Sequence, residues 1–280
     1  MEKYPNYKIV ADSSCDITEL RYTDFATASL KITTSEREFT DDNKLDVTEM
    51  VNYLYGYKGR SGSACPNPDD WMRAFGDAKY VFCVTMTSKL SGTYNSAMLA
   101  KKQYEEKYGD RKVYVLDSLS TGPEMVLILH KLDELINEGL EYDSIVERIN
   151  EYANKTGLMF VLESLQNLAN NGRVRGITAK VAGVLGIRLL GKATEGELEP
   201  LDKCRGEKRA LAAVVRRLKE YGVQTGRVNI THCLNENAAN ELRDLISQEI
   251  PDAKVNIRPC GGLCSFYAEK GGLLIGYEKY

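Results

Sequence analysis

The sequence predicts an α/β fold, with an amino-terminal domain built on a parallel sheet and a carboxyl-terminal α+β domain. Three short apolar runs in the first half, Tyr7–Ala11, Lys79–Met86 and Val113–Leu116, each end in a polar loop. Apolar residues then recur at three- and four-residue spacing in Ser91–Glu106 and Pro123–Glu138, as in amphipathic helices. Strands that alternate with helices indicate a parallel sheet, and the loops at its carboxyl edge are where a functional site is expected.

A small β excursion interrupts this alternation at about residues 26–60. The segment Ala26–Lys44 alternates weakly between apolar and polar residues, which favours short strands. The segment Tyr57–Asp70 contains several Gly and Pro breaks in quick succession and predicts an irregular loop.

The second half of the chain changes character, because its strands are farther apart and its helices come in groups. The strand-like runs are Met159–Leu162, Val228–Thr231, Val255–Ile257 and Leu273–Tyr277, and the helical patterns are Glu207–Glu220 and Asn235–Gln248. This spacing favours an α+β domain. We therefore divide the chain into residues 1–155 and residues 156–280.

Composition excludes several classes of protein. The 280 residues include 37 Lys and Arg against 40 Asp and Glu, a formal charge of −3, whereas a dedicated nucleic-acid binder carries a basic excess. No apolar run approaches the length of a membrane span, and the first residues lack the apolar core of a signal peptide. The expectation is a cytoplasmic protein that binds no nucleic acid and does not insert stably into a membrane.

Cysteine and histidine usage argues against a metal site. The seven cysteines include no Cys-x-x-Cys pair, so neither a disulfide framework nor a zinc ribbon is expected. The two histidines, His130 and His232, are far apart in the chain. We expect no metal, no cofactor and no catalytic residue.

One segment comes close to a nucleotide-binding loop. Gly186-Ile-Arg-Leu-Leu-Gly-Lys-Ala193 has Ala where the motif requires a Ser or Thr that binds magnesium. The preceding residues, 181–185, have a helical pattern rather than that of the required strand. The motif counts only in its structural context, so we expect no nucleotide site here.

Three aspartates at strand ends allow a second hypothesis. Asp12, Asp16 and Asp117 could gather at the carboxyl edge of the sheet as the site of a magnesium-dependent phosphatase. Aspartates at such positions also stabilise turns and cap helices, which is their commoner role. The residues alone leave both interpretations open.

Hydroxyl groups form the more informative constellation. Ser91, Gly92 and Thr93 follow a predicted strand and open a helix, where main-chain N–H groups and the helix dipole favour an anion. The loop that contains Ser61 and Ser63 could face them. Hydroxyls and amides at a helix start can hold a carboxylate or phosphate, although a Ser or Thr there can also be a plain helix cap.

Five motifs, in order along nearly the whole chain, resemble the DegV family of bacterial fatty-acid-binding proteins. They are Asp12-Ser-Ser-Cys-Asp16, Leu90-Ser-Gly-Thr-Tyr-Asn-Ser-Ala97, Leu116-Asp-Ser118, Asn171-Gly-Arg173 and Gly271-Gly-Leu-Leu-Ile-Gly-Tyr277. The resemblance implies a non-enzymatic carrier that holds one long-chain fatty acid, such as palmitate, between its two domains. It also implies that a separate fatty acid kinase is the partner to which the carboxylate is presented.

The resemblance also suggests which residues bind the carboxylate. Ser91 takes the role of the serine in the Leu-Ser-Gly-Thr motif, Ser63 stands where the family has a threonine, and Thr93 assists them. The candidate supporting residues are Ser61, Gly92, Asp12 and Ser13.

Two arginines and the absence of one histidine bear on whether the chain interacts with a kinase. Arg173 and Arg205 lie in segments that match the family, where each could contact a phosphate-bearing partner or an ordinary surface carboxylate. The late His-x-Gly-Pro-Gly element of the family corresponds here to Pro259–Leu263, which has no histidine. This departure weakens the expectation of kinase coupling more than that of lipid binding, and it leaves open a sensor with another apolar carboxylate ligand.

An acyl chain would need an apolar tunnel. The candidate wall residues are Leu162, Leu165, Leu168, Val174, Ile177, Val181, Val184 and Leu185. Periodic apolar positions of this kind also form ordinary core, so the pattern alone does not separate the two roles.

Overall fold

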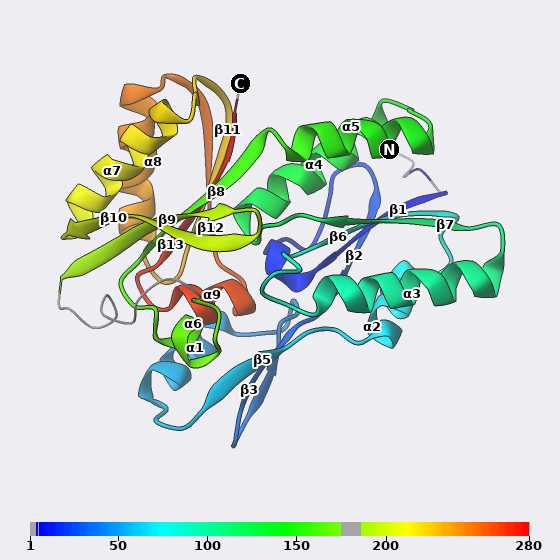
Figure 1. The fold of residues 1–280 in the computed structure, drawn as a ribbon, viewed down its shortest axis with the longest axis horizontal. Helices are drawn as coiled ribbons and strands as arrows, with labels where there is room; N and C mark the ends of the chain where they lie inside the picture. The colour runs from blue at the N-terminus through cyan, green and yellow to red at the C-terminus, as the bar shows by residue number, and fades with distance from the viewer. Residues whose placement is uncertain (1–3, 5, 175–185, 280) are drawn as a thin grey trace.

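The computed structural model describes residue 4, residues 6–174 and residues 186–279. Two larger sheets lie beside each other, with a small third sheet at the bottom of the view in Figure 1. The chain completes the first large sheet before it enters the second. This order confirms the predicted sequence of a parallel-sheet part followed by a part with its own sheet.

Four parallel strands form the first sheet in the order β2-β1-β6-β7. Its strands are β1 (Tyr7–Asp12), β2 (Asp24–Ala28), β6 (Tyr80–Thr85) and β7 (Lys112–Asp117). Its helices are α2 (Pro68–Phe75), α3 (Thr93–Tyr108), α4 (Pro123–Asn137) and α5 (Tyr142–Ala153). Successive side chains of a strand point to opposite faces, so Val10 packs with α2 and α3, whereas Ile9 and Ala11 pack with α4 and α5.

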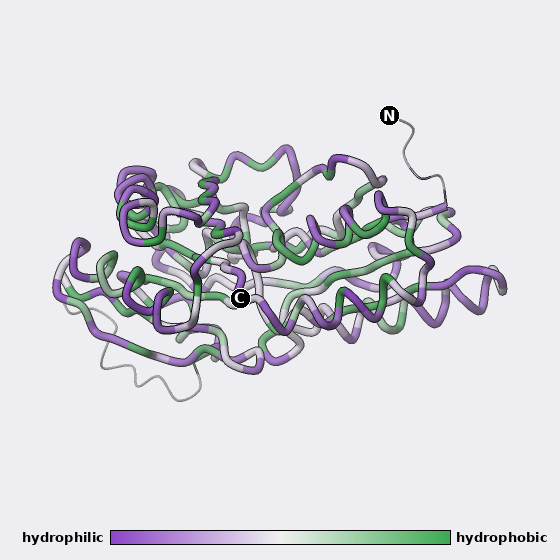
Figure 2. The backbone as a smooth tube through the Cα atoms, turned by 90° about the horizontal axis from the view of Figure 1, so that it is seen from above, coloured by the Kyte–Doolittle hydropathy of each residue, from purple (hydrophilic) through white to green (hydrophobic). Residues whose placement is uncertain are grey.

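Hydropathy follows this layering. In Figure 2 the outer helices alternate between hydrophilic and hydrophobic residues, and hydrophobic residues gather along the strands between them.

The start of helix α2 is explained by its local sequence. Asn67 and Asp70 form a reciprocal capping box, and Pro68 occupies the first turn. This cap ends the short loop that follows the strand carrying Ser63.

The β excursion is a three-stranded antiparallel sheet in the order β4-β3-β5. Its elements are the short turn η1 (Ser13–Cys15) that precedes it, β3 (Lys31–Thr34), β4 (Glu38–Thr40), helix α1 (Val47–Gly56) and β5 (Ser61–Ala64). Two expectations need correction. Residues 26–28 belong to β2 of the parallel sheet, and the predicted irregular loop contains β5. The Ser-Gly-Ser-Ala sequence of β5 has no apolar alternation that would predict a strand. It is a strand because its backbone pairs with β3 at the edge of this sheet.

The second sheet has six strands in the order β10-β9-β8-β13-β11-β12. They are β8 (Thr156–Leu162), β9 (Ile187–Thr194), β10 (Glu197–Arg205), β11 (Thr225–His232), β12 (Asp252–Pro259) and β13 (Leu273–Glu278). Its helices are α6 (Gln166–Asn170), α7 (Glu207–Glu220), α8 (Glu236–Glu249) and α9 (Gly262–Ala268). All neighbouring strands are antiparallel except the parallel pair β11 and β12.

The segment that nearly matches a nucleotide-binding loop is mostly strand β9, which sequence analysis did not predict. Gly186 is a turn residue with φ +79°, and the residues after it pair with β8 and β10. Gly191 faces the Phe160 ring, where a Cβ would lie 2.3 Å from a ring carbon. The glycine therefore makes room for an aromatic side chain rather than for a phosphate. Residues 181–185 lie outside the described part of the chain.

Helix α4 lies between the two large sheets and joins them (Figure 1). Its first turn packs on β13, where a Cβ on Gly276 would lie 2.5 Å from the backbone of Pro123 and Glu124. One hydrophobic core also mixes the excursion with the second sheet, since Ile32 and Phe39 pack with Phe160 and other residues of the sheet. The predicted boundary at residues 155 and 156 coincides with the start of β8, but cores and contacts cross it.

Candidate functional site

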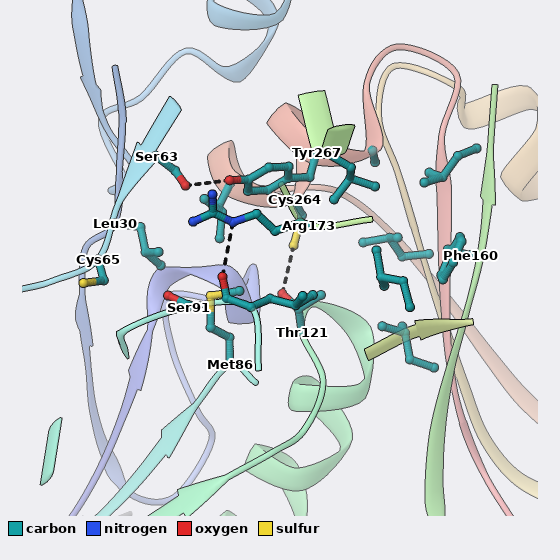
Figure 3. A pocket seen from close by; sticks show the side chains of 18 of the residues that line it. Leu30, Ser63, Cys65, Met86, Ser91, Thr121, Phe160, Arg173, Cys264 and Tyr267 are labelled. Atoms are coloured by element: carbon teal, nitrogen blue, oxygen red, sulfur yellow. Dashed lines mark hydrogen bonds between the residues drawn. The ribbon is translucent and has the colours of Figure 1, made fainter. Parts of the chain in front are cut away.

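A cavity of about 330 Å³ lies where the carboxyl edge of the parallel sheet meets the excursion and the second sheet. Its apolar lining residues are Leu30, Ala64, Met86, Leu90, Leu158, Phe160, Leu162, Leu168, Leu198, Leu263, Ala268 and Leu274. The remaining lining residues are Ser63, Cys65, Ser91, Gly92, Thr121, Arg173, Cys264 and Tyr267. In Figure 3 the labelled Ser63, Ser91, Arg173 and Tyr267 gather at one end, and Phe160 lies at the other.

Two pairs of hydroxyl groups occupy the polar end of the cavity. Ser63 Oγ on β5 lies 2.8 Å from Tyr267 Oη on α9, although the two residues are 204 positions apart. Ser91 Oγ lies 2.6 Å from Thr93 Oγ1 and accepts the N–H of Thr93 at 3.3 Å. Thr93 is fully buried and does not line the cavity, so its contact with the site runs through Ser91.

Arg173 brings a positive charge to the same end. Its Nε donates to the carbonyl of Leu90 at 3.3 Å, and its guanidinium also contacts the carbonyl of Asn171. The turn that directs it follows α6: Gly172 has φ +70°, and the N–H of Arg173 donates to the carbonyl of Leu168 at 2.8 Å. A left-handed glycine after a helix is the usual way to reverse the chain, which accounts for the Asn-Gly-Arg sequence.

Alternate residues of one strand build the apolar end. Leu158, Phe160 and Leu162 of β8 share a face, as the two-residue period of a strand requires, and all three are buried. Leu274 on the neighbouring β13 pairs with Phe160 in register and adds to the same surface. The cavity therefore has an apolar wall that continues the core of the second sheet.

Thr121 and Cys264 lie between the two ends (Figure 3). Thr121 Oγ1 and Cys264 Sγ are 3.7 Å apart, and the thiol donates to the carbonyl of Ser14 at 3.3 Å. Burial raises the pKa of the Cys264 thiol well above its usual value. The thiol is therefore neutral and unreactive at neutral pH.

The aspartates of the phosphatase hypothesis serve the backbone. Asp12 accepts the N–H of Met86 at 2.6 Å, and Asp117 accepts the N–H groups of Ser88 and Leu119, each at 3.1 Å. Burial raises the pKa of Asp12 to about 6, against the opposing hydrogen bonds from Ser14 and Met86. Within residues 6–174 and 186–279, no three His, Cys, Asp or Glu side chains are grouped so that they could hold a metal ion.

Asp16 is unusual among the buried carboxyl groups. Neither of its side-chain oxygens has a hydrogen-bond partner of ordinary geometry within the described structure. Burial, and then the nearby carboxylate of Asp41, raise the pKa of Asp16 well above its usual value. Asp41 instead accepts the N–H groups of Gly262 and Leu263 at 2.7 and 3.0 Å and so caps α9, the helix that carries Tyr267.

The structure separates several residues that sequence analysis placed together. Ser63, Ser91, Gly92 and Arg173 line the cavity, whereas Ser61, Asp12, Ser13 and Thr93 do not. Ser13 Oγ donates to Asp41 at 2.9 Å and accepts the N–H of Leu30, which is a structural role. Arg205 is exposed at the end of β10 and does not line the cavity.

The candidate tunnel wall is only partly the one predicted. Leu162 and Leu168 line the cavity, whereas Leu165 is buried in the adjacent core and Val174 packs against it. Ile177, Val181, Val184 and Leu185 lie outside the described residues. Neither His130 on α4 nor His232 on β11 lines the cavity.

Sequence reasoning missed Tyr267, the aromatic hydroxyl of the site. The available signal was weak: Tyr267 follows the Pro259–Leu263 segment by four residues, in a run that otherwise reads as buried apolar sequence. Its partner Ser63 is close only because α9 packs beside the excursion. A contact over 204 positions leaves no periodic trace in one sequence.

Comparison with known families gives one match over nearly the whole chain. The sequence model of a family described as uncharacterised DegV proteins matches residues 6–279. A DegV domain-containing protein of Streptococcus pneumoniae is 44% identical over 277 residues, which are 97% of this chain and 99% of the relative.

Two solved structures are similar throughout. A DegV family protein of Eubacterium eligens, loaded with heptadecanoic acid, superposes with a TM-score of 0.95 at 44% identity, covering 98% of this chain and 100% of its own. The B3 protein of Streptococcus pneumoniae fatty acid kinase, loaded with linoleic acid, gives the same TM-score, identity and coverage. In the described part of this chain, no helix is both long and apolar enough to cross a bilayer.

Proposed function

This chain belongs to the DegV family, and we propose from that premise that it is a carrier of one long-chain fatty acid, not itself an enzyme. The carboxylate lies at the polar end of the cavity and the acyl chain extends along the apolar end. One observation carries the proposal: a single cavity has hydroxyls and a guanidinium at one end and leucine and phenylalanine side chains along the rest. The similar structures that hold heptadecanoic and linoleic acid support it.

The physical chemistry of the cavity suits such a ligand. At about 0.8 kcal/mol for each buried CH₂, a sixteen-carbon chain contributes roughly 11 kcal/mol before ordering costs. Hydrogen bonds to a charged group contribute about 1.5–3 kcal/mol each. The acyl chain therefore dominates affinity, while the polar end selects an anion and sets its orientation.

We assign the carboxylate to Ser63 and Ser91, with Thr93 acting through Ser91 and the Gly92 backbone adjoining them. Arg173 is reassigned from a partner contact to the countercharge of the carboxylate, because its guanidinium reaches Leu90 beside Ser91. In this proposal residues 1–155 supply the two serines, and residues 156–280 supply Arg173 and most of the apolar end. Asp12 and Ser13 accept backbone N–H groups of Met86 and Leu30, and Ser61 pairs with Thr34 in the sheet of the excursion.

The partner is a separate fatty acid kinase, which would phosphorylate the presented carboxylate. The similarity to a protein of Streptococcus pneumoniae fatty acid kinase supports this assignment. Arg205, exposed on β10, remains the candidate contact for that partner. The Pro259–Leu263 segment holds no histidine, so among the described residues we assign the carboxylate to the hydroxyls and Arg173.

We place the carrier in the cytoplasm. All seven cysteines are free, six of them buried, which suits a reducing compartment.

Native mass spectrometry of gently purified protein tests the proposal. The expected result is an added mass of one long-chain fatty acid, which delipidation removes and palmitate restores. An empty protein that takes up no fatty acid and hydrolyses phosphate esters with magnesium would overturn it in favour of the phosphatase hypothesis.

A variant tests the assignment of Ser91. Ser91→Ala is expected to weaken palmitate binding about tenfold, the loss of one hydrogen bond to a carboxylate, with little change in melting temperature. The matched control is Ser88→Ala in the same loop, whose hydroxyl does not line the cavity. A large loss of stability with unchanged binding would instead make Ser91 a helix cap.

A further inference from the structure

Each serine at the polar end has a second hydroxyl group beside it. Thr93 accompanies Ser91 at 2.6 Å, and Tyr267 accompanies Ser63 at 2.8 Å. The first pair comes from one helix start and is visible in the sequence. The second pair joins β5 to α9 across the cavity, and no resemblance or motif assigned Tyr267 a role.

A serine hydroxyl carries one hydrogen, and its direction decides whether the group can donate to a carboxylate. Any hydroxyl beside Ser63 must either donate to Oγ or accept from it. If Tyr267 donates, the Ser63 hydrogen is free for the ligand; if Ser63 donates, the Tyr267 hydrogen is free. A phenol is a stronger hydrogen-bond donor and a weaker acceptor than an aliphatic hydroxyl, so Tyr267 donates to Ser63 Oγ and the Ser63 hydrogen is left for an anion. A donor that itself accepts a hydrogen bond is a stronger donor.

The Tyr267 ring is held firmly enough to act as a fixed partner. It packs on Phe266 at 4.7 Å between ring centroids and lies against the cores of both halves of the molecule. Its helix is capped by Asp41, and Asn167 donates to the carbonyl of Phe266 at 2.8 Å. These contacts fix the phenol without using its hydroxyl, which is left for Ser63.

The charge of the surroundings indicates which ligand benefits. Arg173 is the one cationic side chain among the described residues of the cavity lining, and no carboxylate lines it. A donor aimed into such a site stabilises an ionised head group more than a neutral ester or alcohol.

We propose that Tyr267 is a positioning residue for the ligand carboxylate, acting through Ser63. Its hydroxyl orients the single hydrogen of Ser63 toward the anion, so the Ser63–Tyr267 pair discriminates an ionised fatty acid from its neutral ester. This inference rests on the proposed function and extends it to a residue on α9. The phenol thus fixes the direction of the Ser63 hydrogen bond at the polar end of the cavity, whose described lining residues include no histidine.

The test is Tyr267→Phe, which removes one oxygen and keeps the ring. Palmitate and methyl palmitate are titrated by displacement of a fluorescent fatty acid and a fluorescent ester, respectively, from delipidated protein. The expected result is a loss of about fivefold in affinity for palmitate, as for one ordinary hydrogen bond, and less than twofold for the ester. The matched control is Tyr55→Phe, because Tyr55 is 77% exposed and outside the cavity.

A double-mutant cycle separates positioning from packing. In a Ser63→Ala background, Tyr267→Phe should cost less than 1.5-fold in palmitate affinity, because the group it orients is gone. An equal loss in both backgrounds, an equal loss for acid and ester, or unchanged palmitate affinity in Tyr267→Phe would each overturn the inference. Wild-type protein that binds no fatty acid would overturn the proposed function and this inference together, whereas wild-type binding with an unaffected Tyr267→Phe variant overturns only the latter.

Discussion

The two ends of the cavity are built in different ways. At the apolar end, Leu158, Phe160 and Leu162 come from alternate positions of one strand. At the polar end, Ser63, Ser91 and Arg173 come from three different segments, and Ser63 and Tyr267 lie 204 positions apart. The comparison teaches that the part of the site responsible for affinity follows from local sequence pattern. The part responsible for orienting the ligand depends on how distant segments pack.

The length of the ligand provides the largest expected effect. Shortening a saturated fatty acid from sixteen to ten carbons removes six CH₂ groups from the apolar end. At about 0.8 kcal/mol each, the loss is about 5 kcal/mol, or about three orders of magnitude in Kd. Displacement titrations with acids of ten, twelve, fourteen and sixteen carbons measure it, and a Kd that changes less than tenfold across the series would contradict the division of roles.

Removing the charge at the polar end should have a smaller effect. Arg173→Gln is expected to weaken palmitate binding by about 10- to 100-fold, the range for a hydrogen bond to a charged group, while methyl palmitate is little affected. Arg209→Gln, an exposed position outside the cavity, is the matched control. Equal losses for acid and ester would mean that Arg173 shapes the cavity instead of neutralising the ligand.

The carboxyl groups behind the polar end affect stability rather than binding. Burial raises the pKa values of Asp12, Asp16 and Asp41 above their ordinary values. The folded state therefore binds protons more tightly than the unfolded state. The stabilisation is complete below the unfolded pKa near 3.8 and is lost as pH rises through the folded values, about 6 for Asp12. The contribution of Asp12 to the free energy of unfolding should therefore fall between about pH 4 and pH 6, and that of Asp16, whose pKa is raised well above its usual value, should continue to fall at higher pH.

The smallest effect concerns Asp16 alone. Asp16→Asn should raise the free energy of unfolding at pH 8 by about 1 kcal/mol, since it removes a carboxyl group whose ionised form is disfavoured by burial and by the Asp41 carboxylate. Asparagine tolerates the left-handed backbone there, where φ is 59°. Urea unfolding at pH 5 and pH 8 measures the change, with exposed Asp110→Asn as the control. Equal gains in the free energy of unfolding at both pH values would show that the gain does not come from the ionisation of Asp16.

Sequence patterns located β1, β6, β7, α3 and α4 of the parallel-sheet part, because buried strands and amphipathic helices repeat locally. They assigned residues 26–28 of β2 to the excursion and did not predict α2 or α5. They also missed the strands β5, β9 and β10, the first two for a common reason. Neither Ser61–Ala64 nor the glycine-containing Ile187–Thr194 has strand-like alternation, and each is a strand because a neighbouring strand pairs with it. Of the candidate site, Ser63, Ser91 and Gly92 were predicted and do line the cavity, but their role at the carboxylate stays a prediction.

The sequence by itself determined the α/β order of the chain, its family resemblance and the serine-bearing loops that follow strands or precede helices. These features depend on residues a few positions apart, so one sequence records them. Only the tertiary structure decided that Arg173 lies inside the cavity, that Asp12 and Asp117 serve backbone N–H groups, and that Tyr267 meets Ser63. Those contacts arise where α9, the excursion and the parallel sheet pack together, and their energies depend on distances in space that no local pattern encodes.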